Sequence, residues 1–125
     1  MSSDKRPAGQ GKPGFTTRQV HAGVVPDPLT GAILTPIYQT TTYVQESVDR
    51  YLAKGYSYSR SANPTVRALE QKLTDLEGGS DCICFGTGMA AINGLFLAFL
   101  RAGDHAIVSD VFYGGTYRLS TKIYS

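Results

Sequence analysis

The chain has 125 residues, of which 42% are hydrophobic and 18% are charged, and its formal net charge at pH 7 is +2. The apolar fraction is too high, and the net charge too small, for a chain that is disordered throughout. The least charged stretch, residues 82–100, is interrupted by Gly86, Gly88, Asn93 and Gly94, so we expect no membrane-spanning helix. Because no Lys/Arg stripe with interleaved aromatic residues is present, we expect no nucleic-acid partner.

The N-terminal part of the chain lacks a regular hydrophobic period. Residues 1–14 are a mixture of Ser, Lys, Pro and Gly that predicts a disordered tail. Residues 15–57 are punctuated by Pro26, Pro28, Gly31 and Pro36. A run of about forty irregular residues is long for a loop inside a compact domain. We therefore interpret residues 15–57 as an arm that packs on a neighbouring subunit.

A clear helical pattern follows, within a domain that we expect to begin at residue 58 and to run to residue 125. Asn63 is a favourable N-cap residue, and Pro64 suits the first helical position. One apolar face then repeats at spacings of three, four and three residues through Val66, Leu69, Leu73 and Leu76. The glycine pair at 78–79 predicts the end of this helix.

The remaining elements predict an α/β fold. Residues 81–85 and 105–109 have the composition of short buried strands. Between them, residues 89–101 predict an apolar helix that Gly103 terminates, and a third helix is predicted to open at Thr116. This order of strand, helix, strand, loop and helix is typical of a layered fold with a mostly parallel sheet.

The turn at residues 86–89 is the first candidate site. A predicted strand runs into glycines, and a helix begins immediately, so free backbone N–H groups would point at one place. This arrangement suits a phosphate group. The alternative is a plain strand-to-helix turn that uses glycine for its backbone freedom.

A dinucleotide-binding module is a rival interpretation of the same segment. Residues 86–91 fit the pattern G-x-G-x-x-[GA], with Gly86 and Gly88 as its first two glycines. Asp110 ends the next predicted strand 24 residues after Gly86, where such modules hold a ribose hydroxyl. This interpretation gives no role to the tyrosine- and arginine-rich loop upstream.

Two loops with tyrosine could also contact a ligand. Tyr58 and Arg60 lie in a loop before the first predicted helix, where a guanidinium and a phenol could clamp an anion. Tyr113 follows the second predicted strand, at the sheet edge where ligands bind in open α/β folds, and its ring could cover a flat ligand. The alternatives are a solvated arginine and a packing tyrosine.

No metal site is expected. Cys82 and Cys84 are the only cysteines, and His21 and His105 stand at unrelated spacings, so the chain lacks the ligand pattern of a metal centre. The two cysteines are more consistent with reduced thiols of a cytoplasmic protein.

The three loops together resemble the Cys/Met-metabolism family of pyridoxal-phosphate enzymes, which includes cystathionine γ-synthases, γ-lyases and β-lyases, methionine γ-lyases and homoserine-ester sulfhydrylases. The resemblance covers about residues 15–125. Its motifs are Tyr58-Ser59-Arg60-Ser61-Ala62-Asn63-Pro64-Thr65, Gly88-Met89-Ala90-Ala91 and Asp110-Val111-Phe112-Tyr113-Gly114-Gly115-Thr116. Residues 15–23 and 36–42 resemble motifs of the family's N-terminal arm.

The resemblance implies a role for each loop. Gly88 and Met89 resemble the positions whose backbone amides hold the phosphate of pyridoxal 5′-phosphate. Tyr113 resembles the aromatic residue that stacks on the pyridine ring and helps proton transfer. Arg118 matches an arginine near the substrate in members that process cystathionine.

The resemblance also implies an assembly. Tyr58 and Arg60 resemble the pair that reaches the phosphate of a neighbouring subunit's cofactor. The full-length protein would then be a homo-oligomer, a dimer of dimers (homotetramer). An arm at residues 15–57 would pack between its subunits.

Two positions and one absence refine the expected activity. Gly115 stands where bacterial methionine γ-lyases carry a cysteine, and Ser57 where mammalian-type cystathionine γ-lyases carry a glutamate. Both departures favour a γ-synthase or a generalised cystathionine enzyme. Lys54, Lys72 and Lys122 match no motif for the lysine that holds the cofactor covalently.

The sequence therefore predicts the N-terminal portion of a fold-type-I pyridoxal-phosphate transferase, with an aspartate-aminotransferase-like large domain that is truncated here. We expect a transsulfuration enzyme of carbon–sulfur bond chemistry that acts on cystathionine or homoserine esters, by γ-elimination or γ-replacement. We expect the 125-residue chain alone to be inactive. The alternative within the family is a non-catalytic chain that pairs with a full-length subunit.

Overall fold

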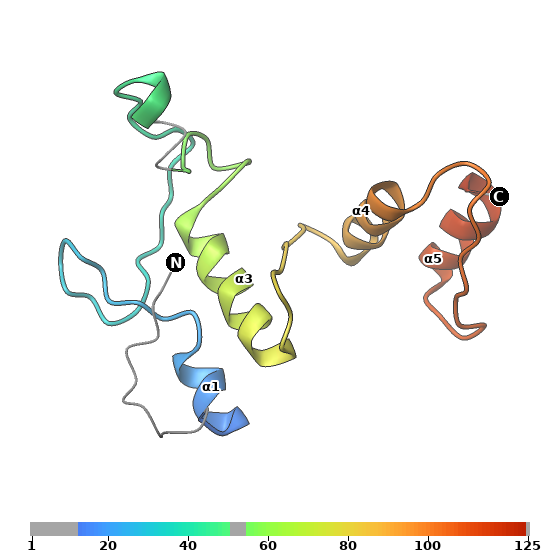
Figure 1. The fold of residues 1–125 in the computed structure, drawn as a ribbon, viewed down its shortest axis with the longest axis horizontal. Helices are drawn as coiled ribbons and strands as arrows, with labels where there is room; N and C mark the ends of the chain where they lie inside the picture. Colours follow the sequence, from blue (N-terminus) through green and yellow to red (C-terminus); the bar gives the residue numbers. More distant parts are fainter. Residues whose placement is uncertain (1–12, 51–54, 125) are drawn as a thin grey trace. The chain divides into compact units, whose positions relative to one another are not determined.

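The computed structural model describes residues 13–50 and 55–124. The chain divides into two compact units, the first of which ends at Ile83 and the second of which begins at Cys84. Each unit is described by itself. The helical elements of Figure 1 are α1 (Phe15–His21), α3 (Pro64–Glu77), α4 (Gly88–Phe99), α5 (Gly114–Arg118) and the π-helix η1 (Leu119–Ile123). Residues 48–50 are also helical. The predicted tail at residues 1–14 lies outside the described residues except for its last two positions, and the division into tail, arm and domain stays a prediction.

Helix α3 has the bounds that its capping residues predict. The Asn63 side chain accepts a hydrogen bond from the Thr65 N–H at 2.8 Å, and Pro64 occupies the first turn. At the other end, Gly78 adopts a left-handed conformation with φ of 68°, and its N–H reaches the carbonyls of Thr74 and Asp75. The sequence prediction for this helix is confirmed.

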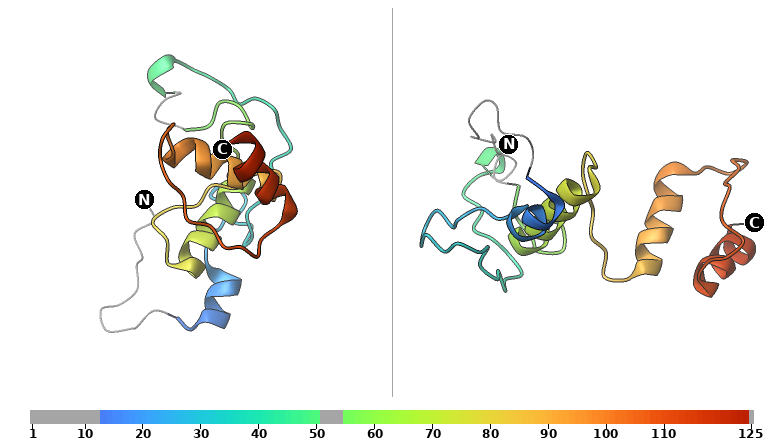
Figure 2. Two further views of the ribbon diagram at one scale, coloured as in Figure 1. Left: turned by 90° about the vertical axis from the view of Figure 1, so that its right-hand side faces the viewer. Right: turned by 90° about the horizontal axis from the view of Figure 1, so that it is seen from below.

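Helix α1 is an element that hydrophobic periodicity did not predict. Its seven residues hold too few apolar positions to show a period, and Thr16 and Thr17 in its first turn favour extended chain. Tertiary contact stabilises it instead: α1 lies beside α3 in Figures 1 and 2, and Arg18 Nε is 2.8 Å from Asp75 Oδ2. The start of the predicted arm thus packs on helix α3 of its own chain.

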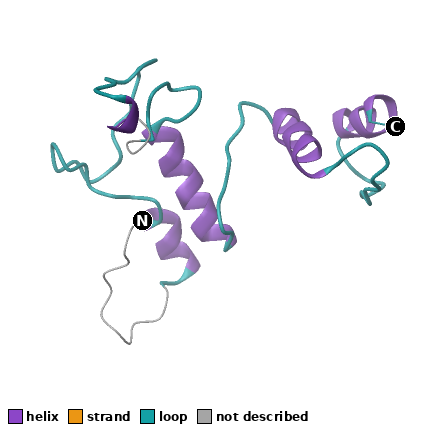
Figure 3. Cartoon of the chain, turned by 45° about the horizontal axis from the view of Figure 1, so that its top comes forward, coloured by secondary structure: helices purple, strands orange, loops and turns teal. Residues whose placement is uncertain are grey.

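The two predicted strands are not strands in this structure. Residues 81–85 and 105–109 take part in no ladder among the described residues, and Figure 3 draws them as loops. A strand requires a partner for its backbone N–H and C=O groups, and no described segment supplies one. The side chains of Ile83 and Ile107 are accordingly exposed. In the described part of the chain, the only β-type pairing is an isolated antiparallel bridge between Thr42 and Tyr58.

The helices of the second unit differ slightly from prediction. Helix α4 ends at Phe99 rather than at residue 101, because Leu100 turns to an extended conformation while its N–H still reaches the Phe96 carbonyl. Helix α5 begins at Gly114, two residues before the predicted start, and continues as η1. Tyr124, just after η1, donates to Asn93 Oδ1 at 2.7 Å, which joins this end of the chain to α4.

Little apolar surface is covered within the described residues. Leu119 is the single buried hydrophobic side chain among them, and Leu95, Leu97 and Phe99 on α4 are exposed. None of the helices described is long and apolar enough to cross a bilayer. Exposed side chains of this size are those that a larger fold or a partner subunit would cover.

Candidate functional site

The start of α4 presents backbone N–H groups that have no partner in the described part of the chain. Thr87 is the N-cap residue, and its Oγ1 accepts a hydrogen bond from the Ala90 N–H at 3.1 Å. Its carbonyl accepts from the Ala91 N–H at 3.1 Å. The N–H groups of Gly88 and Met89 therefore remain without an acceptor among the residues described. The sequence reasoning overlooked Thr87, although a threonine directly before a helix is a recognisable N-cap signal.

The space around these two N–H groups is open. A Cβ atom placed on Gly86 or on Gly88 would meet no other atom within 4 Å. The positive end of the α4 dipole adds to the attraction for a negative group at this point. The segment therefore has both the donors and the room that a phosphate needs.

The Tyr113 loop packs against the same turn of α4. A Cβ atom on Gly115 would lie 2.6 Å from Tyr113 Cε1 and 2.8 Å from Met89 Sδ. Thr116 Oγ1 donates a weak hydrogen bond to Met89 Sδ at 3.9 Å. Tyr113 is nevertheless 70% exposed, so its ring is available to a ligand. The structure thus brings together the predicted residues Gly88, Met89 and Tyr113.

Arg118 lies at the end of α5 and folds back along that helix. Its Nη1 is 3.9 Å from the position that a Cβ atom of Gly114 would occupy. It makes no ion pair within the described residues. The guanidinium thus lies near Gly114, the residue that follows Tyr113, and its charge and paired N–H groups suit a carboxylate.

Tyr58 and Arg60 belong to the first unit and contact each other. Arg60 Nη2 donates to the Tyr58 hydroxyl at 3.2 Å, and the Arg60 guanidinium carbon lies 5.3 Å from the centre of the Tyr58 ring. This combination of a hydrogen bond and a cation–π contact holds the guanidinium in place without neutralising its charge. The pair thus presents a cation and a phenol at the same place.

The backbone of this loop is held by the segment before it. The Tyr43 N–H donates to the Ser57 carbonyl at 3.0 Å, and the Ser59 N–H donates to the Thr41 carbonyl at 2.9 Å. Asn63 Nδ2 adds a hydrogen bond to the Tyr38 carbonyl at 3.0 Å. Asn63 therefore caps α3 and also fastens the loop, a second role that its position in the sequence does not reveal.

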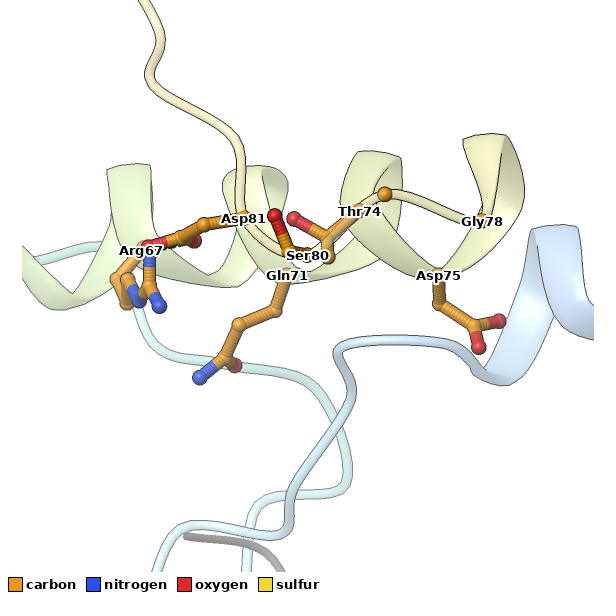
Figure 4. A pocket seen from close by; sticks show the side chains of 8 residues that line it. Arg67, Gln71, Thr74, Asp75, Gly78, Ser80 and Asp81 are labelled. Carbon is orange, nitrogen blue, oxygen red and sulfur yellow. Dashed lines mark hydrogen bonds and ion pairs between the residues drawn. The ribbon is translucent and has the colours of Figure 1, made fainter.

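The first unit has a hollow of about 290 Å³ between α3 and the segment at residues 78–81, and Figure 4 shows the side chains that line it. Arg67 and Asp81 point toward one another there, with Nη1 and Oδ1 2.8 Å apart. The hydrogen bond from Arg67, and then that from the Cys82 N–H, hold the pKa of Asp81 below its usual value. None of the predicted site residues lines this hollow, and its charged side chains form ion pairs, Arg67 with Asp81 and Asp75 with Arg18.

The described residues, 13–50 and 55–124, contain no group of three His, Cys, Asp or Glu side chains placed to hold a metal ion. No disulfide joins the thiols of Cys82 and Cys84 within the described residues. The groups described above that could attract an anion are the N–H donors at the start of α4 and the Arg60 guanidinium beside Tyr58.

Comparison with known proteins identifies relatives of the whole segment. The family model described as Cys/Met metabolism PLP-dependent enzyme matches residues 16–125. The cystathionine γ-synthase of Mycobacterium tuberculosis is 44% identical over 123 residues, which is 98% of this chain and 31% of that protein. The cystathionine β-lyase of Coxiella burnetii is 50% identical over 107 residues, 86% of this chain and 27% of the lyase.

Solved structures of the same kind are also similar. The crystal structure of metB from Corynebacterium glutamicum matches with a TM-score of 0.82 and 46% identity, over 90% of this chain and 29% of that one. The cystathionine γ-lyase of Lactobacillus plantarum, complexed with L-serine, matches with a TM-score of 0.79 and 41% identity, over 89% and 28%. The chain therefore spans less than a third of the length of these relatives.

Proposed function

Because the chain belongs to the Cys/Met metabolism family of PLP-dependent enzymes, we propose that it carries part of the cofactor site of a transsulfuration enzyme acting on cystathionine or homoserine esters. The predicted fold class, fold-type-I, is confirmed by the family match and by the structural neighbours. The cofactor of this family is pyridoxal 5′-phosphate. The same match sets aside the dinucleotide-binding interpretation of Gly86, Gly88 and Asp110.

The observation that carries the proposal is the pair of free N–H groups at Gly88 and Met89, next to the exposed Tyr113 ring. These residues fit the cofactor, because donors for a phosphate and a flat face for a pyridine ring lie in one unit. When bound, pyridoxal 5′-phosphate supplies an electron sink for chemistry at the carbon–sulfur bond. The Gly88 and Met89 amides would hold its phosphate, and Tyr113 would cover the ring and help move a proton.

The other predicted site residues complete the proposal. Arg118 is free of ion pairs among the described residues and is proposed to contact the substrate. Tyr58 and Arg60, held together at 3.2 Å, are proposed to donate to the phosphate of a neighbouring subunit's cofactor in a dimer of dimers. The names of the relatives, cystathionine γ-synthase, β-lyase and γ-lyase, support a sulfur amino acid as substrate. We further propose a cytoplasmic enzyme, because the two cysteines of the sequence show no disulfide framework.

The test is a comparison of pyridoxal 5′-phosphate with pyridoxal, which lacks the phosphate. We expect the chain to bind the phosphorylated form at least about tenfold more tightly, because two N–H donors and a helix dipole favour the anion. Inorganic phosphate should compete. Equal affinity for the two compounds, measured by equilibrium dialysis, would refute the proposal that the Gly88 and Met89 N–H groups bind the phosphate.

Borohydride reduction of the same mixture tests the expected inactivity of the isolated chain. We expect no specific lysine adduct in peptide mass spectra. A stoichiometric adduct on Lys54, Lys72 or Lys122 would contradict the proposal that these lysines do not hold the cofactor.

A non-catalytic role is the second candidate. It is favoured by the exposed apolar side chains of α4, such as Leu95, Leu97 and Phe99, which a partner subunit would cover. In this case the chain would pair with a full-length subunit of the family. Co-elution with purified full-length cystathionine γ-synthase in size-exclusion chromatography would support pairing, and separate elution at micromolar concentrations would argue against it.

A further inference from the structure

We propose that Gly115 is a positioning residue, whose missing side chain lets the Tyr113 ring and the Met89 thioether meet at the first turn of α4. The inference rests on the proposed function in one respect, since it treats the ring and the phosphate-binding amides as parts of a single cofactor site. It assigns a role to the Met89 side chain, where the resemblance assigned one only to its backbone.

The contact geometry supports this role. The point where a Gly115 Cβ would stand lies 2.6 Å from Tyr113 Cε1, 3.0 Å from Tyr113 Cδ1 and 2.8 Å from Met89 Sδ. Real Cβ atoms essentially never approach other heavy atoms as closely as 2.6 or 2.8 Å. The ring edge and the sulfur therefore both lie where a side chain at position 115 would begin, and a thioether beside an aromatic edge is a favourable arrangement.

Thr116 fixes the sulfur in this arrangement. Its Oγ1 donates to Met89 Sδ at 3.9 Å, so the residue after Gly115 restrains the side chain that Gly115 accommodates. Met89 is also the second residue of α4, and its N–H is one of the two free donors. The position of the tyrosine ring and the position of the anion-binding donors are thereby linked through one residue.

A side chain at position 115 should move the ring without unfolding the helix. The nearby atoms belong to side chains, which can shift, and not to backbone. Alanine is also a better helix former than glycine, so Gly115→Ala does not weaken α5 intrinsically. The neighbouring Gly114 provides a matched control, because its Cβ would meet only Arg118 Nη1, at an ordinary 3.9 Å.

Methyl NMR of the full chain tests the contact directly. The sequence has only two methionines, Met1 and Met89, so a chain labelled with ¹³C-methyl methionine gives two methyl signals. We expect a nuclear Overhauser effect between the Met89 methyl and the Tyr113 ring in the native chain and in Gly114→Ala, and its loss in Gly115→Ala. Absence of this effect from the native chain, or its persistence in Gly115→Ala, would overturn the proposal.

Pyridoxal 5′-phosphate then tests the link to the cofactor. We expect Gly115→Ala to bind it about tenfold more weakly than Gly114→Ala, with an altered circular-dichroism band of the bound cofactor, because overpacking displaces the ring. Equal affinity and equal spectra in the two variants would overturn the link. If the native chain keeps the methyl–ring contact but binds no cofactor, the positioning of the ring is supported and the proposed function fails.

Discussion

The contact between the arm and α3 depends on a glycine whose replacement has a calculable effect. Gly23 has φ of +69°, and a Cβ atom there would lie 2.6 Å from the Ala68 carbonyl oxygen and 2.8 Å from the Lys72 nitrogen. Both are backbone atoms of α3, which cannot move aside without breaking the helix. Gly23→Ala should therefore lift the arm from α3 and loosen α1, which packs there through Arg18.

Gly31 supplies the control for this substitution. It has a similar φ of +73°, but a Cβ atom there would meet nothing within 4 Å. Gly31→Ala should lower the free energy of unfolding by only about 1–2 kcal/mol, because alanine is strained in a left-handed backbone conformation. Gly23→Ala should lower the free energy of unfolding by the same amount and by about 1–3 kcal/mol more, because its Cβ atom overlaps the backbone of α3. The difference between the two variants isolates the overlap.

Hydrogen exchange measures how much each of the two variants destabilises the end of α1. The Ala22 N–H donates to the Arg18 carbonyl at 2.8 Å at the end of α1. We expect its exchange in Gly23→Ala to be about tenfold or more faster than in Gly31→Ala, since 1.4 kcal/mol corresponds to a factor of ten. Equal exchange rates in the two variants would refute the argument that close backbone approach holds the arm on α3.

Two further predictions concern the helix cap and an ion pair. Thr87→Ala should destabilise α4 by about 1 kcal/mol, because the Ala90 N–H loses its acceptor. Thr87→Ser keeps a hydroxyl at this position and should retain most of the stability. Equal helical circular dichroism in the two variants would contradict the role of Thr87 as a cap. The hydrogen bond from Arg67 lowers the pKa of the Asp81 carboxyl from its ordinary value of 3.8. The ion pair should therefore stabilise the fold fully above pH 3.8, and this stabilisation should be lost as the pH falls through the lowered pKa. In an NMR titration, Arg67→Gln should move the pKa of Asp81 back up, and an unchanged midpoint would show that Arg67 is not the cause.

Local signals in the sequence predicted the parts of the fold that depend on local interactions. Asn63, Pro64 and Gly78 each act within one helical turn, and they fix the bounds of α3 as expected. Helix α1 was missed because its stability comes from contact with α3, including the Arg18–Asp75 pair 57 residues apart. The strands at residues 81–85 and 105–109 were expected because of their composition, but a strand forms only where another strand provides hydrogen bonds.

The candidate site was predictable to a similar degree. The N–H groups of Gly88 and Met89 are donors because a helix begins directly after the glycine-rich turn, and both the turn and the helix were predictable from the sequence. The meeting of Tyr113 with Met89 joins positions 24 residues apart, and no periodicity or motif spacing indicates which side chains touch. The same holds for Asn63, whose contact with the Tyr38 carbonyl became visible only in three dimensions.

The donors at the start of α4 have a consequence for the working conditions of the site. Peptide N–H groups neither gain nor lose a proton at physiological pH. A phosphate monoester, in contrast, takes up its second proton near pH 6. The acidity of the surroundings would then influence retention of the ligand through the charge of the ligand itself, while the donors at residues 88 and 89 stay the same.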